Sequence, residues 1–96
     1  MSVPQIVLMT GCVSGIGLAT AKRLARDPDQ RFLVIATVIS LHLKDDLVAA
    51  VGDALDKTVF IKELDVTKDE QISNVVDDVI KQHGHIDILC KHIIQL

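Results

Sequence analysis

A glycine-rich stretch near the N-terminus has the residue types and spacing of a phosphate-binding turn. Residues 10–17 read Thr-Gly-Cys-Val-Ser-Gly-Ile-Gly and directly follow an apolar run at residues 6–9. A helix N-terminus offers unpaired backbone N–H groups and a partial positive charge, and both favour a phosphate. Residues without a Cβ atom let the phosphate approach the backbone closely. The pattern therefore predicts a nucleotide-phosphate site between a buried strand and a helix.

Each glycine of this turn has its own expected role. Gly11 lets the chain turn sharply out of the strand, Gly15 lets the backbone reach a pyrophosphate, and Gly17 lets the new helix pack against the sheet. Thr10 and Ser14 add hydroxyl groups that brace the loop or donate to a phosphate. The alternative is a glycine-rich turn that holds no ligand. The position after a strand and at the start of a helix favours the phosphate site.

The elements that would position this turn alternate between strand and helix along the chain. Apolar runs predict buried strands at residues 6–9, 32–37, 58–64 and 86–90. Helical spacing of apolar residues predicts helices at about residues 15–26, 44–55 and 67–84. Thr67 and Glu70 form a capping box at the start of the third helix, and Gly84 is its natural stop.

This alternation, with short connections, predicts an α/β fold with a parallel sheet and right-handed crossovers. We expect a doubly wound sheet with the strand order 3-2-1-4. The glycine turn would then lie at the switch point between the first and fourth strands, where such sheets bind ligands.

Composition limits the classes of partner. The 96 residues are 49% hydrophobic, which is enough for one small core. With a net charge of −3 and no basic run, we expect no nucleic acid partner. The longest apolar stretch, residues 32–43, contains polar side chains and is too short to span a bilayer. We see no signal peptide, and we expect Cys12 and Cys90 to be free thiols in the reducing cytoplasm.

The histidines give no metal-binding pattern. His83 and His85 flank the glycine that would end the third helix. No further ligand cluster accompanies them, so we interpret them as solvated turn residues and expect no metal.

Three motifs together resemble the short-chain dehydrogenase/reductase family. They are residues 10–17, the run Leu64-Asp65-Val66-Thr67, and the run Gly84-His85-Ile86-Asp87-Ile88-Leu89. The resemblance covers residues 3 to about 89 and is strongest to the branch of photoreceptor-type retinol dehydrogenases and estradiol 17β-dehydrogenase. It implies a Rossmann fold, a nicotinamide dinucleotide partner and reversible oxidation of a hydroxyl group on a lipid-like alcohol.

The resemblance also implies cofactor-binding residues. The cofactor-phosphate turn is matched by Gly11, Ser14, Gly15, Ile16 and Gly17. Asp65 matches the acidic residue that accepts a hydrogen bond from the adenine amino group, and Val66 matches the neighbouring backbone contact. Asp65 is also a carboxylate at a helix start, where the helix dipole favours it, and the two roles are compatible.

The chain departs from the family pattern at the ribose. Ile39 stands where the resembling branch has an arginine suited to the 2′-phosphate of NADP. No Asp or Glu ends the second strand to bind the 2′-hydroxyl of NAD. Lys44 is either a substitute cation or a solvated lysine at a helix start. The resemblance favours NADP, Ile39 weakens that preference, and we expect weak binding of both NADP and NAD.

A second departure concerns catalysis. The family's Asn-Asn-Ala-Gly after the fourth strand is replaced by Lys91-His92-Ile93-Ile94, and the chain contains no tyrosine. The family's Tyr-x-x-x-Lys, in which tyrosine is the general acid/base, therefore has no counterpart here, and we expect no catalytic residue. We expect residues 1–96 to form a truncated dinucleotide-binding Rossmann domain, the N-terminal half of the doubly wound sheet.

Two functions follow as hypotheses. The first is the cofactor-binding part of an NAD(P)-dependent oxidoreductase for a retinol- or steroid-like alcohol. The second is a non-catalytic nucleotide-binding fragment, or a truncated isoform that sequesters a partner. The fourth strand, followed by Ile93, Ile94 and Leu96, would be an apolar edge that invites homo-oligomers. We expect a cytoplasmic location, and the resemblance implies membrane association as an alternative for the full-length family.

Overall fold

The predicted alternation of strands and helices is confirmed in the computed structural model, which describes residues 3–91. Its strands are β1 (Gln5–Met9), β2 (Phe32–Val38), β3 (Val59–Glu63) and β4 (Ile88–Cys90). Its helices are α1 (Gly15–Ala25), α2 (Asp45–Val51) and α3 (Asp69–His83), with short 3₁₀ helices η1 (Leu41–Leu43) and η2 (Gly52–Ala54).

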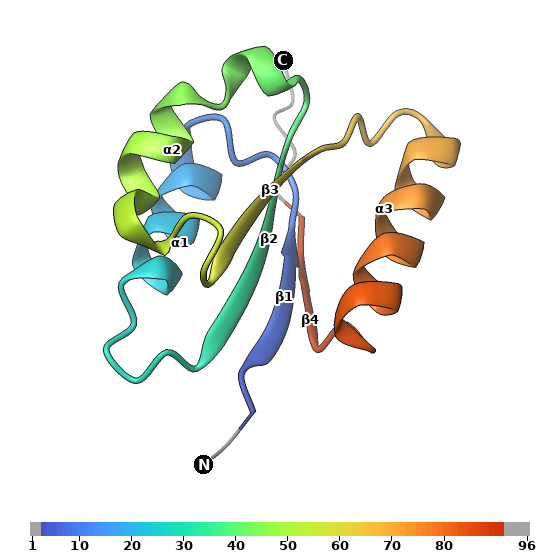
Figure 1. The fold of residues 1–96 in the computed structure, drawn as a ribbon. Coiled ribbons are helices and arrows are strands. Elements are labelled where there is room, and N and C mark those ends of the chain that lie inside the picture. The colour runs from blue at the N-terminus through green and yellow to red at the C-terminus, as the bar shows by residue number, and fades with distance from the viewer. Residues whose placement is uncertain (1–2, 92–96) are drawn as a thin grey trace.

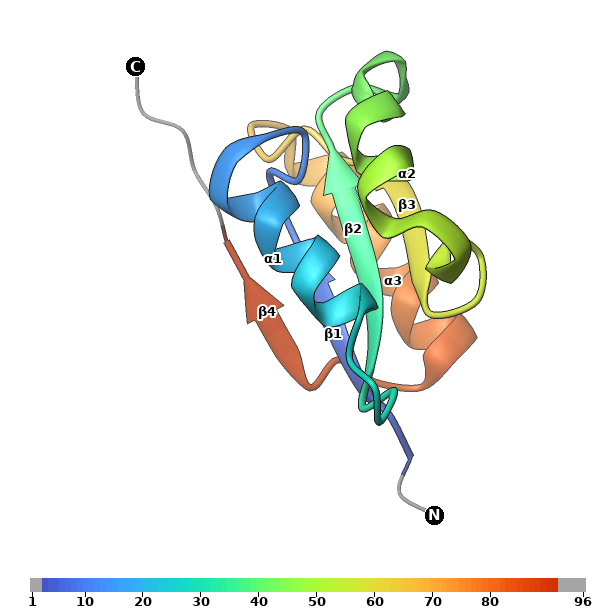
Figure 2. The same cartoon turned by 90° about the vertical axis from the view of Figure 1, so that its left-hand side faces the viewer.

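The strands form one parallel sheet in the order β3-β2-β1-β4, which confirms the predicted doubly wound topology. Val7 at the centre of β1 is in register with Val34 of β2 and Ile88 of β4. Helices α1 and α2 cover one face of the sheet and α3 covers the other (Figure 1). The perpendicular view places α1 and α2 in front of the strands and α3 behind them (Figure 2).

The hydrophobic core is divided between the two faces. Alternate strand residues such as Val7 and Met9 belong to the cluster beneath α1 and α2. Their neighbours Ile6 and Leu8 belong to the cluster beneath α3. Because successive side chains of a strand point to opposite faces, a strand covered on both sides is a continuous apolar run. This is why residues 6–9 and 32–37 predicted strands so clearly.

Helix α2 is shorter than the sequence predicted. Its last residue is Val51, and Gly52 has a φ of 56° before the chain continues as η2. A left-handed residue interrupts the helical hydrogen bonds, although Leu55 still packs against the core beneath α1 and α2. Apolar spacing therefore continued past the end of the α-helix.

The capping box predicted for α3 is wrong. Lys68 is the N-cap, and it makes no side-chain capping hydrogen bond. The backbone N–H and the hydroxyl of Thr67 both donate to Asp65 Oδ1, at 3.0 and 2.6 Å. The Thr67 hydroxyl is therefore engaged by the Asp65 carboxylate and does not cap α3. The predicted stop is confirmed, because Gly84 is left-handed and its N–H donates to the Ile80 carbonyl at 2.7 Å.

Strand β4 lies at one edge of the sheet and pairs with β1. It begins two residues later than predicted because the Asp87 carboxylate takes a position in the ladder, where Oδ2 accepts the Ile6 N–H at 2.7 Å. The expected edge residues Ile93, Ile94 and Leu96 lie outside the described residues.

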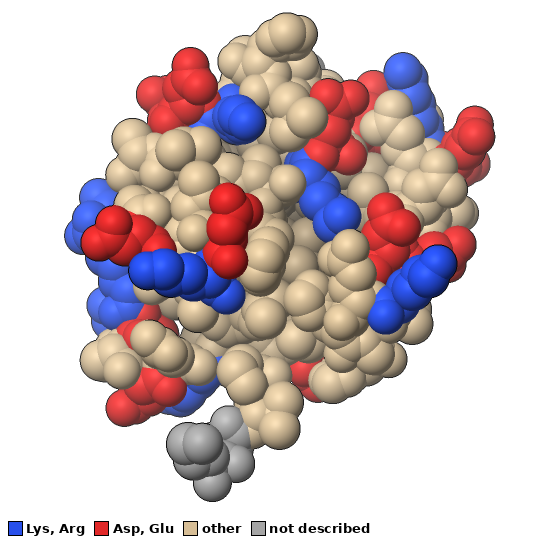
Figure 3. Space-filling model, viewed as in Figure 1, with Lys and Arg blue, Asp and Glu red and all other residues tan. Residues whose placement is uncertain are grey.

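The surface carries charges of both signs. Lys and Arg side chains alternate with Asp and Glu over the face seen in Figure 3. Over residues 3–91, no helix is long and apolar enough to cross a membrane, and no group of three or more potential metal-ligating side chains occurs.

Candidate functional site

The glycine turn is held by both strands that flank β1. Thr10 N–H donates to the Cys90 carbonyl of β4 at 2.9 Å, and Cys12 N–H donates to the Thr37 carbonyl of β2 at 3.0 Å. The Thr37 hydroxyl is fully buried and donates to the Met9 carbonyl at 2.8 Å. These bonds fix the turn at the carboxyl edge of the sheet, at the predicted switch point between β1 and β4.

The backbone of the turn needs glycine at two positions. Gly11 and Gly15 have φ values of 67° and 61°, in the left-handed region where a side chain is strained. A Cβ atom at Gly15 would meet nothing within 4 Å, so the backbone there faces open space. Gly15 is also the first residue of α1, so this open space lies beside a helix N-terminus.

The expected packing role of Gly17 needs a correction. A Cβ atom at Gly17 would lie 2.9 Å from the carbonyl carbon of Gly11 and would overlap its oxygen. Helix α1 thus uses Gly17 to approach the glycine turn, and the sheet is not the neighbour that excludes a side chain. The close approach is possible because the turn folds back over the first residues of α1.

Ser14 and Ile16 both face outward at the start of α1. Ser14 is the N-cap of the helix, but its exposed hydroxyl makes no capping hydrogen bond. The Ile16 side chain is 75% exposed. The N-terminal N–H groups of α1 are therefore not satisfied by the Ser14 side chain, which is the condition under which a helix start binds an anion.

A cavity of about 390 Å³ opens beside the turn. It lies where the chain leaves β1, β2 and β3, three segments that emerge at the same edge of the sheet (Figure 1). Its lining residues are Thr10, Gly11, Val13, Ser14, Ile39, Leu43, Leu64, Asp65, Val66 and Thr67. The structure thus brings together Gly11, Ser14, Asp65 and Val66 from the predicted set. The other members, Gly15, Ile16 and Gly17, do not line this cavity.

Asp65 lines the cavity, and hydrogen bonds hold its carboxylate in place. Oδ1 accepts both Thr67 hydrogen bonds, and the Asp65 N–H donates to Gln71 Oε1 at 2.9 Å. The hydroxyl and the N–H of Thr67, and then the charge of Lys68, hold the pKa of the Asp65 carboxyl below its ordinary value. The group is therefore ionised at neutral pH, and its hydrogen bonds within residues 3–91 leave Oδ2 open to a donor.

Sequence reasoning missed part of the cavity wall. Leu43 lines the cavity because the chain forms η1 directly after β2. The Ser40 hydroxyl accepts the His42 N–H at 3.3 Å, and Leu41 N–H donates to Glu63 Oε2 at 3.2 Å. The sequence signal available for this 3₁₀ helix was a serine N-cap before an apolar-polar-apolar triplet. It was hidden because residues 32–43 read as one long apolar stretch.

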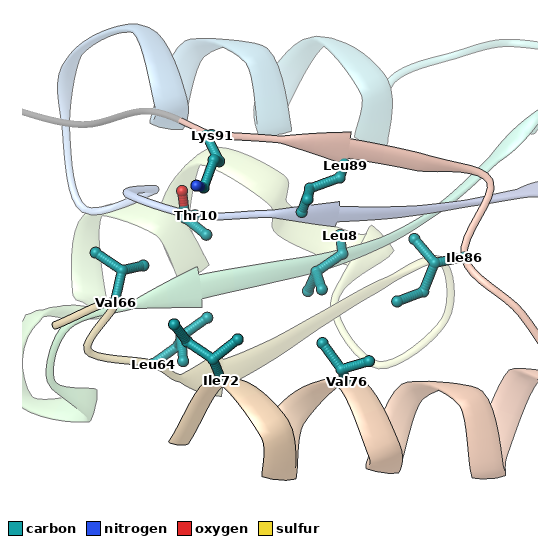
Figure 4. Close-up of a pocket in the computed structure, with 9 residues that line it drawn as sticks. All are labelled: Leu8, Thr10, Leu64, Val66, Ile72, Val76, Ile86, Leu89 and Lys91. Atoms are coloured by element: carbon teal, nitrogen blue, oxygen red, sulfur yellow. The ribbon is translucent and has the colours of Figure 1, made fainter. Parts of the chain in front are cut away.

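A second cavity, of about 380 Å³, lies between the sheet and α3 (Figure 4). Its lining residues are Leu8, Thr10, Leu64, Val66, Ile72, Val76, Ile86, Leu89 and Lys91. Thr10 and Lys91 lie at one end, and Val76 and Ile86 lie toward the other (Figure 4). Thr10, Leu64 and Val66 line both cavities, so the two cavities share a wall.

The comparison with known proteins agrees with this architecture. The model of the family described as short chain dehydrogenase matches residues 5–92, and the chain belongs to this family. The chain is 43% identical over 86 residues to retinol dehydrogenase 8 of Bos taurus, covering 90% of this chain and 27% of that protein. It is 36% identical over 88 residues to 17-beta-hydroxysteroid dehydrogenase type 1 of Mus musculus, covering 90% and 25%.

Solved structures show the same fold. A short-chain dehydrogenase from Streptomyces avermitilis superposes with a TM-score of 0.72 at 34% identity, covering 88% of this chain and 29% of that one. The resemblance to the retinol and steroid dehydrogenase branch is therefore confirmed. The chain spans about a quarter of the length of these relatives.

Proposed function

We propose that this chain is the cofactor-binding part of an NAD(P)-dependent oxidoreductase that acts on a retinol- or steroid-like alcohol. One observation carries the proposal: the glycine turn at the start of α1 lies beside a cavity that Asp65, an ionised carboxylate, also lines. Residues 1–96 would then act as a dinucleotide-binding domain in the cytoplasm.

The residues present fit a dinucleotide. Gly11 and Gly15 give the turn a backbone without Cβ atoms, and the open face at Gly15 leaves room for a pyrophosphate. Ser14 supplies an exposed hydroxyl, and Ile16 and Gly17 supply N–H groups of the first turn of α1. The helix dipole and these donors together favour the negative charge of the phosphates.

The adenine would lie in the cavity beside the turn. Asp65 Oδ2 is suited to accept a hydrogen bond from the adenine amino group, and Val66 lines the same cavity. The apolar side chains of Ile39, Leu43 and Val66 offer surfaces for the faces of a flat aromatic base. Shape and charge thus agree with the roles expected from the family resemblance.

The substrate class rests on the relatives. Retinol dehydrogenase 8 and 17-beta-hydroxysteroid dehydrogenase type 1 are named for a retinoid and a steroid alcohol. A bound nicotinamide would supply hydride transfer to or from such a substrate. The residues of this chain bind and orient the cofactor, and with no tyrosine they lack the general acid/base of the family.

A second candidate function is a non-catalytic nucleotide-binding fragment or an isoform that sequesters a partner. Purified chain incubated with retinol or estradiol and either nicotinamide cofactor separates the two candidates. We expect no turnover from the chain alone. Turnover that disappears in a Gly15→Ala variant would show that the chain is catalytic by itself.

Binding tests the cofactor role directly. Isothermal titration with ADP, NAD⁺ and NADP⁺ should show at least one complex in which Gly15→Ala weakens affinity tenfold or more. Gly52→Ala is a matched control, because Gly52 also has a positive φ of 56° with nothing near its Cβ position, but lies at the end of α2. Both variants strain the backbone, and only the first alters the proposed site. Equal losses in the two variants, or no binding by any of the three ligands, would refute the proposal.

A further inference from the structure

We infer that the cavity beside the glycine turn selects a ribose with a free 2′-hydroxyl and rejects a 2′-phosphate, so that NAD is preferred over NADP. This inference rests on the proposed function and adds the cofactor preference and the residues that set it. The residues are Ile39 and Leu43, which form the wall that follows β2.

The wall is built by the chain that leaves β2. Strand β2 ends at Val38, Ile39 follows at the carboxyl edge, and η1 then turns the chain so that Leu43 returns to the cavity. Leu43 N–H donates to the Ser40 carbonyl at 2.9 Å, which closes the turn. Ile39 and Leu43 are 56% and 47% exposed, so their side chains present apolar surface to an incoming ligand.

The charge of the cavity disfavours an additional phosphate. Among the described lining residues Asp65 alone carries a charge, and it is negative. A phosphate monoester carries roughly −1.5 to −2 charges near neutral pH. It would meet an apolar wall and the Asp65 carboxylate, with no lysine or arginine among the described lining residues.

A charge that loses water without gaining a partner is costly to bury. Dinucleotide sites that accept a 2′-phosphate use an arginine, whose planar guanidinium binds two phosphate oxygens together. Lys44 follows Leu43 in the sequence, but it is the N-cap of α2 and does not line the cavity. The phosphate-binding donors at Ser14 and Gly15 lie at the start of α1 and are engaged by the pyrophosphate in the proposed pose. The 2′-phosphate therefore lacks a cation, whereas a neutral 2′-hydroxyl avoids this cost.

The test compares ligands that differ only at the 2′ position. Isothermal titration of the chain with NAD⁺ and NADP⁺ should give at least tenfold tighter binding of NAD⁺, about 1.4 kcal/mol. Adenosine 5′-monophosphate and adenosine 2′,5′-bisphosphate form a smaller pair for which the same order is expected. Adenosine 3′,5′-bisphosphate has the same charge as the 2′,5′ isomer and shows whether total charge alone explains the difference.

Three variants assign the preference to the wall. Ile39→Arg and Leu43→Arg should each raise the affinity for NADP⁺ relative to NAD⁺ at least tenfold. Leu41→Arg adds the same charge to the same 3₁₀ helix at a residue that does not line the cavity, and it should change the ratio less than twofold. Far-ultraviolet circular dichroism of each variant establishes that it is folded.

The outcomes separate this inference from the proposed function. Binding of NADP⁺ as tight as NAD⁺, or an equal response to all three arginine variants, overturns the inference and leaves the cofactor site intact. A 3′,5′ isomer that binds as weakly as the 2′,5′ isomer also overturns it, because the wall would not be reading the 2′ position. Failure of ADP, NAD⁺ and NADP⁺ alike to bind would refute the proposed function itself.

Discussion

Gly17 of α1 lies directly against the carbonyl group of Gly11, so that a Cβ atom at Gly17 would overlap the Gly11 oxygen. The two glycines are thus complementary. Gly11 folds the chain back with a φ of 67°, and Gly17 provides the space that the folded chain occupies. The pair sets how closely the start of α1 approaches the turn.

Gly17→Ala tests this relationship. We expect a loss of about 1–3 kcal/mol in the free energy of unfolding, because backbone atoms must move to accept the methyl group. Urea unfolding followed by circular dichroism measures it. Ala19→Ser changes an exposed position of the same helix and should stay within about 0.5 kcal/mol of the parent chain. An unchanged midpoint for Gly17→Ala would mean that the turn and helix are not in contact in solution.

Asp65 gives a pH-dependent contribution to stability. Its pKa is lowered in the folded chain, mainly by hydrogen bonds from Thr67, so the folded state favours the ionised form. This contribution is fully present above the ordinary aspartate pKa of about 3.9 and is lost as the pH falls through the lower folded value. Urea midpoints at pH 7 and pH 3 should therefore differ less in Asp65→Asn than in the parent chain.

The control for that series is Asp77→Asn, an exposed aspartate of α3 for which no side-chain hydrogen bond is found among the described residues. It should keep the pH response of the parent chain. A response reduced equally in both variants would assign the effect to net charge.

The two cysteines should differ in reactivity. Burial raises the pKa of the Cys12 thiol to about 11, and its side chain is fully enclosed. Cys90 is half-buried at the edge strand. Iodoacetamide at pH 8 should label Cys90 first, as read from peptide masses, because the thiolate is the reactive form and Cys12 stays protonated. Both should react at similar rates in urea. Faster labelling of Cys12 in the folded chain would contradict its enclosure.

The edge strand should make the chain self-associate. β4 pairs with β1 alone among the described strands, and Leu89 on β4 is 59% exposed. We expect light scattering to show dimers or larger species whose mass rises with concentration, since an unpaired apolar edge accepts another strand. Leu89→Lys should shift the mass toward the monomer. A constant mass near 10.5 kDa for the parent chain would contradict the prediction.

The sheet could be predicted because each strand is buried on both faces. Runs such as residues 6–9 and 32–37 then have no alternating polar residues to obscure them, and glycine marks the start of α1 and the stop of α3. The strand order followed from the doubly wound topology expected of alternating strands and helices. These features depend on residues near one another in the sequence.

The predictions that were wrong depend on contacts that the spacing of apolar residues in the sequence does not reveal. Thr67 bonds to Asp65 in place of a helix cap, and Asp87 occupies a ladder position that an extended residue was expected to hold. Leu43 joins the cavity through a 3₁₀ turn inside an apolar stretch. Gly17 was correctly singled out as a close-packing residue, but its neighbour is the turn. In each case a short polar group or a positive φ overrides the periodic pattern.

The hydrogen bonds of Thr37 affect how fast a nucleotide binds at the glycine turn. Its hydroxyl and carbonyl hold both sides of the glycine turn, through Met9 and Cys12. A ligand that arrives at this turn finds its backbone donors already arranged, so little conformational entropy is lost on binding. Association with a nucleotide should therefore be governed by diffusional encounter, without a slow ordering phase. Removing the Thr37 hydroxyl would convert a rigid receptor into one that must first be ordered.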